Sequence, residues 1–270
     1  MSYRRKIYYF ILITVTAACV LGGTARHILG MGSEGRNIFG IAESGDPADS
    51  SSGSFMEDLG RFLSVEIKVS AANVAVEYGS DYSISGTFSH NMKPEYKVER
   101  NKLTVTQVDA AQKHILGVND SDCMIKITVP SEAYVSSVDA EIDVGSLNID
   151  KVKANSFRAD IGTGSVMMKK LEFSGGSITM KTGNVKLDQI EFRRLGIESG
   201  SGDVSLTSED SLGDCSMDLR TDMGDVRLLG KSYYTVYKKS GDRNHTLNVK
   251  VSTGNVNVDK PKMESDKSKA

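Results

Sequence analysis

Tryptophan is absent from the 270-residue sequence, and proline (4), histidine (4) and cysteine (3) are rare. No two cysteines form a CxxC pair, which argues against a zinc site. Outside the cell Cys123 and Cys215 can pair as a disulfide, or both can remain buried thiols. The formal net charge of −2 lacks the strong basic excess that is typical of nucleic-acid-binding proteins. We therefore expect no nucleic-acid partner.

The N-terminal segment carries a targeting signal. Arg4, Arg5 and Lys6 precede a stretch with no charged side chain, residues 7–25. This length suffices for one membrane-spanning helix. Because positive charges stay in the cytoplasm, the rest of the chain is expected outside it. We predict an uncleaved signal anchor over residues 1–29, with a cleaved signal peptide or a lipoprotein modified at Cys19 as alternatives.

The sequence divides into four parts by composition. After the anchor, residues 30–60 are rich in glycine, serine and acidic residues, which is typical of a flexible extracytoplasmic linker. Residues 61–260 contain short alternating runs and form the expected β-strand-repeat domain. Residues 261–270 form a polar tail.

A glycine recurs within that domain, each time followed by a small polar or acidic residue. The first four copies lie at positions 145, 164, 183 and 202, a constant spacing of 19, and the last two, at 224 and 254, follow after longer steps. An earlier degenerate copy has Ala72 in the glycine position. We predict that the glycines are structural turn residues with positive φ, at the first position of II′ turns. They are Gly145, Gly164, Gly183, Gly202, Gly224 and Gly254.

Apolar residues alternate with polar ones on both sides of every glycine. This period of two predicts half-buried strands, so each repeat is expected to form a strand, a corner and a second strand. After the glycine, the residues expected to face the core are Leu147/Ile149, Val166/Met168, Val185/Leu187, Val204/Leu206, Val226/Leu228 and Val256/Val258. Before it, they are Val138/Ala140/Ile142, Phe157/Ala159/Ile161, Ile178/Met180, Leu195/Ile197, Met217/Leu219 and Leu247/Val249/Val251.

Two all-β architectures fit this repeat. In a β-solenoid each repeat unit is one coil, and equivalent strands stack in parallel. In the alternative, each unit is a hairpin of an antiparallel sheet. The constant spacing favours the solenoid, because stacked coils must keep an equal circumference. A strand-rich N-terminal segment begins at Phe62 and is expected to cap the first coil, and no long amphipathic helix is expected up to Lys260.

The residue after each glycine is a candidate ligand, because stacked coils would align these oxygens. Only Asp203 and Asp225 are acidic in this set, whereas calcium prefers six to eight oxygen ligands. We therefore expect each side chain to bond its own backbone at the corner, and we predict no metal, no cofactor and no catalytic residue. The set is Ser146, Ser165, Asn184, Asp203, Asp225 and Asn255.

The longest insertion between corners, Lys231–His245, mixes tyrosines with basic residues. Aromatic and cationic side chains of this kind contact glycans, anionic polymers and protein partners. The alternative is an extra strand or hairpin whose tyrosines pack on the end of the solenoid. The possible binding surface comprises Tyr233, Tyr234, Tyr237, Lys238, Lys239 and Arg243.

The sequence resembles a bacterial family of β-strand-repeat proteins known as "putative adhesin", a domain of unknown function. The "ITVP" strand at Ile127–Pro130 and the recurring "TGSV", "TGNV" and "SGSGDV" corners carry the resemblance, which covers about residues 62–259. Met223 departs from the Ser or Thr that is more usual there. The resemblance implies a membrane-anchored, extracytoplasmic β-helix-like domain, and it supplies no catalytic residues.

Together these features predict a non-catalytic protein of the bacterial cell envelope. It would be a single-pass protein of the cytoplasmic membrane, with its C-terminal domain outside the cytoplasm, presenting a rigid surface for binding or adhesion. The expected partner is an envelope protein or polymer. The alternatives are an accessory role in envelope-stress signalling and, less favoured, a polysaccharide-acting enzyme, which would need a groove with converging Asp, Lys and Arg.

Overall fold

The computed structural model describes residues 52–88, 92–107, 123–130, 134–208 and 212–261. All of them belong to one of two units into which the chain divides, Asp49–Ala270. Within these ranges the regular structure is entirely β, which confirms the all-β prediction for this part of the chain. No helix long and apolar enough to cross a membrane occurs there. The predicted anchor, 1–29, lies outside the described residues.

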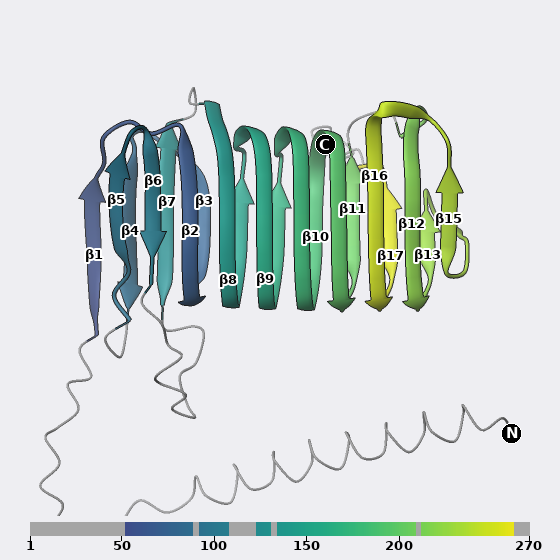
Figure 1. The fold of residues 1–270 in the computed structure, drawn as a ribbon, viewed down its shortest axis with the longest axis horizontal. Helices are drawn as coiled ribbons and strands as arrows, with labels where there is room; N and C mark the ends of the chain where they lie inside the picture. Colours follow the sequence, from purple (N-terminus) through teal and green to yellow (C-terminus); the bar gives the residue numbers. More distant parts are fainter. Residues whose placement is uncertain (1–51, 89–91, 108–122, 131–133, 209–211, 262–270) are drawn as a thin grey trace, which may run out of the picture. The chain divides into compact units, whose positions relative to one another are not determined.

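Seventeen strands are formed (Figure 1). Those before the repeats are β1 (Gly53–Asp58), β2 (Ser64–Ala71), β3 (Asn73–Gly79), β4 (Ser83–Phe88), β5 (Glu95–Glu99), β6 (Lys102–Thr106) and β7 (Met124–Pro130). Those of the repeats and their insertions are β8 (Tyr134–Asp150), β9 (Lys153–Lys169), β10 (Glu172–Ser201), β11 (Val204–Ser208), β12 (Cys215–Met223), β13 (Val226–Leu228), β14 (Lys231–Ser232), β15 (Val236–Lys239), β16 (Asp242–Thr253) and β17 (Val256–Asp259).

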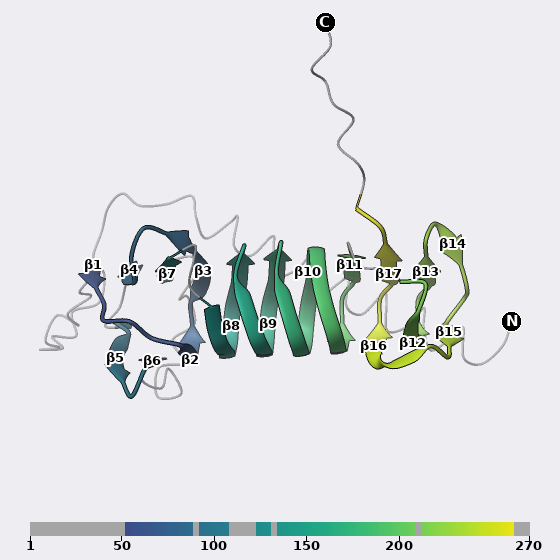
Figure 2. The same ribbon diagram turned by 90° about the horizontal axis from the view of Figure 1, so that it is seen from above.

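Equivalent strands of successive repeats pair in parallel. β8 pairs with β9, and β9 with β10, at the constant spacing of the repeat, so that Gly145 lies beside Gly164 and Gly164 beside Gly183. β10 pairs with β11 at the same spacing. Each coil runs through one sheet, bends at its glycine and returns through a second sheet (Figure 2). The solenoid prediction is therefore confirmed for these residues, and the alternative of antiparallel hairpins is wrong for the repeats.

The last two repeats are stacked out of chain order. β16 pairs with β10 on one side and with β12 on the other, and β17 lies in the same way between β11 and β13. The final repeat therefore fills a place between the fourth and fifth repeats. The degenerate copy with Ala72 is also out of order, because β2 and β3 lie between β8 and the later strands β6 and β7.

Antiparallel strands close both ends of the stack. At the first end β5 pairs with β6, and β4 pairs with β7 and β1. At the other end β15 pairs with β12 and β14 with β13. The linker was predicted to reach residue 60, but its last part forms strand β1, in which Phe55 packs against the core. The rest of the predicted linker, up to residue 51, and the tail from residue 262 lie outside the described residues.

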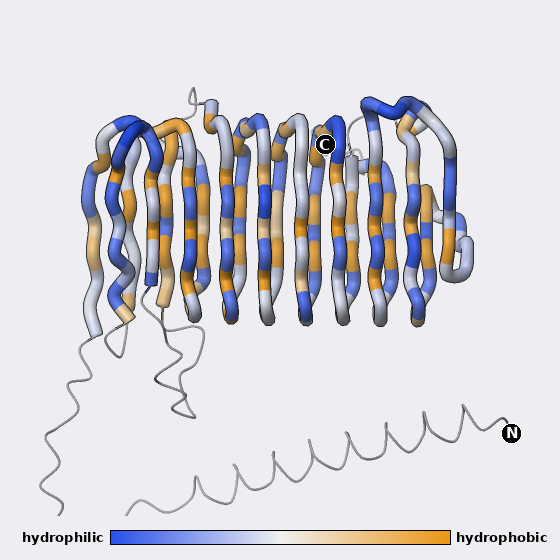
Figure 3. Tube along the Cα trace, in the orientation of Figure 1, coloured by the Kyte–Doolittle hydropathy of each residue, from blue (hydrophilic) through white to orange (hydrophobic). Residues whose placement is uncertain are grey.

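The space between the two sheets is filled by the alternating apolar residues. Every residue that the period of two predicts to face the core is buried, with at most 5% of its surface exposed. Hydrophilic and hydrophobic residues alternate along each strand in Figure 3. Cys123 and Cys215 belong to this core as buried thiols and do not form a disulfide with each other.

Each of the six predicted glycines has a positive φ, between 128° and 151°. These values are far from the roughly 60° at the first position of a II′ turn, so that turn assignment was wrong. In β8, β9 and β10 the strand continues through the glycine, which bends it rather than reversing it. A Cβ atom at Gly183 would also overlap the carbonyl oxygen of Gly164 in the neighbouring coil. Conformation and close stacking therefore both require glycine.

The opposite corner was not predicted from the sequence. Lys151, Lys170 and Gln189, which are spaced as the glycines are, adopt the left-handed conformation with φ between 52° and 56°. The residue that follows each of them is buried, namely Val152, Leu171 and Ile190. This buried residue, recurring at the spacing of the repeat, was the available signal for the second corner.

Candidate functional site

The polar residues after the glycines form a ladder along one edge of the stack. Their side chains bond the next coil rather than their own backbone, contrary to expectation. Asn184 Oδ1 accepts the amide hydrogen of Asp203 (2.9 Å), and Asp203 Oδ1 accepts that of Asn255 (2.7 Å). Asn255 Oδ1 in turn accepts the amide hydrogen of Asp225 (3.1 Å). These hydrogen bonds hold neighbouring coils in register, so the side chains of the ladder have a structural role.

The end of the stack next to β12 and β13 carries the insertion that was predicted as a binding surface. We name Lys231–Lys239 the C-terminal cap. A two-residue turn, Leu229–Gly230 with φ of 51° and 76°, reverses the chain after β13, as expected for a type I′ hairpin. The chain then forms β14, crosses to the other sheet and forms β15. The cap covers the exposed edges of the last coil.

Three of the six predicted residues stabilise the cap itself. Tyr233 and Tyr237 are partly buried against the core, with their ring centroids 4.6 Å apart. The ammonium group of Lys239 donates to the carbonyl oxygens of Leu212 and Gly213. The insertion thus includes the strand that the alternative interpretation expected, and its tyrosines divide between packing and exposure.

Tyr234 is the exposed aromatic residue of the cap, with 84% of its surface accessible. Its φ is 51°, a conformation that is uncommon for a bulky residue. Its carbonyl oxygen accepts the amide hydrogen of Val226, and the carbonyl oxygen of Val226 accepts the amide hydrogen of Tyr233. The backbone around Tyr234 is therefore fixed to β13 while the ring projects into solvent.

Two salt bridges lie where strand β15 of the cap meets β12. Asp218 of β12 pairs with Arg220 and with Lys238 of β15, the latter at 3.4 Å. The hydrogen bond from Arg220 lowers the pKa of Asp218 below its usual value, although partial burial opposes this. Lys238 is thus engaged by an ionic partner on its own sheet.

A β-bulge lies where β16 begins, beside a cavity in the described part of the chain. Cys215 pairs with Asp242, but the next residue, Ser216, pairs with Thr246, so three residues of β16 have no counterpart in β12. Bulges of this kind re-aim side chains and often lie beside functional sites. The cavity below the bulge has a volume of about 620 Å³. We name it the bulge pocket; its lining residues are Phe192, Arg193, Arg194, Asp214, Asp242, Asn244 and His245.

An aromatic row leads into the bulge pocket. The rings of Phe157, Phe173 and Phe192 follow one another with centroids 6.4 Å and 6.2 Å apart. His245 continues this row, since its ring meets Phe192 edge-on at 5.3 Å. Its Nε2 atom is buried and has no hydrogen-bond partner among the described residues. A second cavity of about 210 Å³ adjoins the first, because Phe192 and Arg193 line both.

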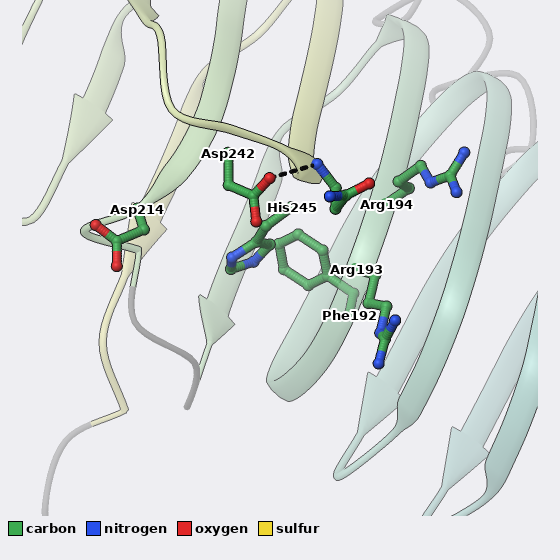
Figure 4. Close-up of a pocket in the computed structure, with 7 residues that line it drawn as sticks. Phe192, Arg193, Arg194, Asp214, Asp242 and His245 are labelled. Atoms are coloured by element: carbon green, nitrogen blue, oxygen red, sulfur yellow. Dashed lines mark hydrogen bonds between the residues drawn. The ribbon is translucent and has the colours of Figure 1, made fainter.

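The charged side chains of the bulge pocket lie on two sides of His245 (Figure 4). Arg193 and Arg194 project from β10 on one side, and Asp214 lies on the other. Asp242 accepts the amide hydrogen of Asn244 through Oδ1 (2.9 Å), which fixes the start of the bulge. No ion pair joins any of these arginines and carboxylates within the described ranges, although Arg158 and Arg220 on the same sheet both pair with an aspartate.

Sequence reasoning found one residue at the edge of this site, Arg243, and missed the residues that line the cavity. A signal was present in the repeat. In the three preceding coils the residues equivalent to Arg193 and Arg194 are Ser136–Ser137, Asn155–Ser156 and Ser174–Gly175. Only the fourth coil replaces small residues with a pair of arginines. Within the described ranges no cluster of His, Cys, Asp or Glu could hold a metal ion.

The Toastrack DUF4097 family model matches residues 63–269, which is most of the chain. The chain belongs to this family. No curated protein matches the sequence at a significant level.

Among solved structures, the fold is similar to that of two proteins described as adhesion proteins. One is a putative cell adhesion protein from Clostridium sporogenes ATCC 15579, with 16% identity, a TM-score of 0.41 and coverage of 78% of this chain and 100% of that one. The other is a putative adhesin from Bacteroides fragilis NCTC 9343, with 13% identity, a TM-score of 0.45 and coverage of 79% and 100%. A putative lipid binding protein from Parabacteroides distasonis ATCC 8503 is also similar, with 12% identity, a TM-score of 0.32 and coverage of 80% and 98%.

Proposed function

We propose that this protein is a membrane-tethered, extracytoplasmic and non-catalytic binding domain of the bacterial cell envelope. Its β-solenoid serves as a rigid support, and its C-terminal cap presents the surface that contacts an envelope protein or polymer. The observation that carries this proposal is Tyr234, an exposed aromatic ring on a backbone held in an unfavourable conformation. Unfavourable backbone conformations persist where the surrounding structure enforces them, and they cluster at binding sites.

The stack supports a binding role because it leaves the cap little freedom to move. Each coil is bonded to both neighbours along two sheets, and the corner ladder adds side-chain bonds at one edge. The cap is bonded in turn to β12 and β13. Binding to a preorganised surface avoids the entropy cost of ordering it. The predicted anchor at residues 7–25 would hold this surface outside the cytoplasmic membrane.

Site-specific photocrosslinking in cells tests this proposal. A benzophenone amino acid replaces Tyr234 in one strain and Met167 in another; Met167 is an exposed residue of the repeat in β9, far along the stack. We expect one reproducible adduct from position 234 and none from position 167. No adduct at either position, or equal adducts at both, would contradict a binding surface at the cap.

A second variant separates the ring from the fold. Asn tolerates the left-handed conformation, so Tyr234→Asn removes the ring while keeping the backbone. With the benzophenone placed at Val236, an exposed residue of β15, the adduct should weaken at least about tenfold when Tyr234→Asn is added. An unchanged adduct would show that the ring does not contribute to binding.

One observation favours a second candidate, a polysaccharide-acting enzyme. Such an enzyme would need carboxylates and basic residues in a groove, and the bulge pocket has both. Incubation of the purified chain with acidic polysaccharides, followed by measurement of new reducing ends, tests this alternative. Release of fragments that is lost in Asp242→Asn would replace the binding proposal with an enzymatic one.

A further inference from the structure

We propose that the bulge pocket binds a hydroxylated unit, a sugar or polyol, that carries one phosphate or carboxylate group. The unit would belong to an anionic polymer or be free in solution. This site is separate from the ring of Tyr234, and the inference holds whether or not the cap binds a partner.

The two arginines of the pocket are the first observation. Arg193 and Arg194 occupy positions that hold small residues in the three preceding coils, so stacking does not require them. Neither forms an ion pair with a described residue, in contrast to Arg158, whose guanidinium bonds Asp160 (2.8 Å). Guanidinium groups bind phosphate and carboxylate with paired, charge-assisted hydrogen bonds. An anionic group is therefore the chemistry that suits this side of the pocket.

Hydrogen-bond acceptors on the opposite side are the second observation. Asp214 and Asp242 are exposed, and neither pairs with a cation among the described residues. Carboxylate oxygens accept hydrogen bonds from hydroxyl groups, and Asn244 beside them can both donate and accept. A simple anion such as a lone phosphate would leave this side unused and would be repelled by it. A ligand with hydroxyl groups as well as one negative charge uses both sides.

His245 is the third observation. Three coils place phenylalanine in the row that His245 continues, so a fourth phenylalanine would be sufficient if this position had only a packing role. The imidazole instead brings to the pocket a buried Nε2 atom that has no hydrogen-bond partner among the described residues. Buried polar atoms are nearly always hydrogen-bonded, so an atom without a partner in the protein is available to one from outside it. A hydroxyl group of the ligand is such a partner.

The volume of the pocket limits the ligand. A cavity of about 620 Å³ lies within the range of small-molecule sites, roughly 300–1,000 Å³. Its neighbour of about 210 Å³ shares Phe192 and Arg193 and extends the space along the aromatic row. A chain of such units can therefore continue past the pocket along the edge of the sheet.

Titration of the full chain, purified in a non-ionic detergent, tests the proposal. The probes are D-glucuronic acid, which carries a carboxylate, and glycerol 3-phosphate, with glucose and glycerol as neutral controls. Binding is followed by the NMR signals of ¹³C-labelled histidine, of which the chain has four. We expect at least one charged probe to bind at least about tenfold more tightly than its neutral control and to shift the His245 signal.

The matched variants are taken from the repeat itself. Arg193→Ser with Arg194→Ser reproduces Ser136–Ser137 of the first coil, and it should weaken binding of the charged probe at least about tenfold. Arg158→Ser with Arg220→Ser removes the same charge elsewhere on the sheet and should leave binding unchanged. The urea midpoint of each variant shows that it is folded.

His245→Phe extends the aromatic row, so it should keep the fold while weakening the binding of the neutral and the charged probe together. Because this variant lacks the His245 signal, its binding is measured by isothermal titration calorimetry and compared with wild type in the same assay. The identity of the charged probe that binds shows whether the pocket takes a carboxylate or a phosphate group. Equal affinity for charged and neutral probes, or full binding by the folded Arg193→Ser, Arg194→Ser variant, would overturn the proposal.

Discussion

Replacement of Gly183 by alanine should disrupt the stack far more than the small size of the added methyl group suggests. The φ of Gly183 is +137°, a region that is almost exclusive to glycine, where another residue costs about 1–3 kcal/mol. The new Cβ would also overlap the carbonyl oxygen of Gly164, so the two coils would have to move apart. Displacement of the corner also disturbs the next residue, Asn184, which accepts the Asp203 amide hydrogen from the following coil, a bond worth about 1 kcal/mol. The free energy of unfolding should fall by about 3 kcal/mol.

The same strand provides the control. Gly196 also lies in β10, has no positive φ and has no atom within 4 Å of the position of a new Cβ. Gly196→Ala should therefore be neutral or stabilise the domain by about 0.4–1 kcal/mol, because it reduces the freedom of the unfolded chain. Both variants are compared by urea unfolding, followed by far-UV circular dichroism.

The melting temperature gives a second readout. A domain of this size shifts by about 2–4 °C per kcal/mol, so Gly183→Ala should melt about 6–12 °C lower. If the two variants unfold within about 0.5 kcal/mol of each other, neither the positive φ nor the close approach of the coils makes glycine necessary at the corners.

Two further predictions concern side chains of the core and the cap. In a Cys19→Ser background, iodoacetamide should label neither Cys123 nor Cys215 until urea is added, because both thiols are buried. Burial also raises the pKa of Cys123, although the hydrogen bond from Gln107 opposes this. Rapid labelling of the folded chain would contradict the burial of the two thiols. Since Arg220 lowers the pKa of Asp218, this carboxylate stabilises the fold above about pH 3.8 and stops doing so as the pH falls through its lower folded-state value. Urea unfolding of Asp218→Asn should therefore differ from wild type at pH 6 and match it near pH 2, and a constant difference would refute this.

Much of the fold was predictable because its signals are local and periodic. The period of two around Gly145 or Gly202 identifies the buried face of each strand, since side chains alternate between the faces of a sheet. The constant spacing of the glycines predicts parallel stacking, since equal coils superimpose. The cap was located by the same means, as the longest interruption of that spacing. The residues that line the bulge pocket were not located, although Arg193–Arg194 departs visibly from the repeat.

The sequence by itself determined the coil: its length, its inward-facing residues and the glycine at its corner. Only the tertiary structure decided the order of the coils. Val256 pairs with Val204 and Val226, its neighbours in space but not in sequence, because similar coils offer nearly the same edge to one another. The position of each coil in the stack depends on the connecting segments, which allow the final repeat to insert between the fourth and fifth repeats. The bulge pocket arises at that insertion, from β10, the segment before β12 and β16, and so no single stretch of sequence could show it.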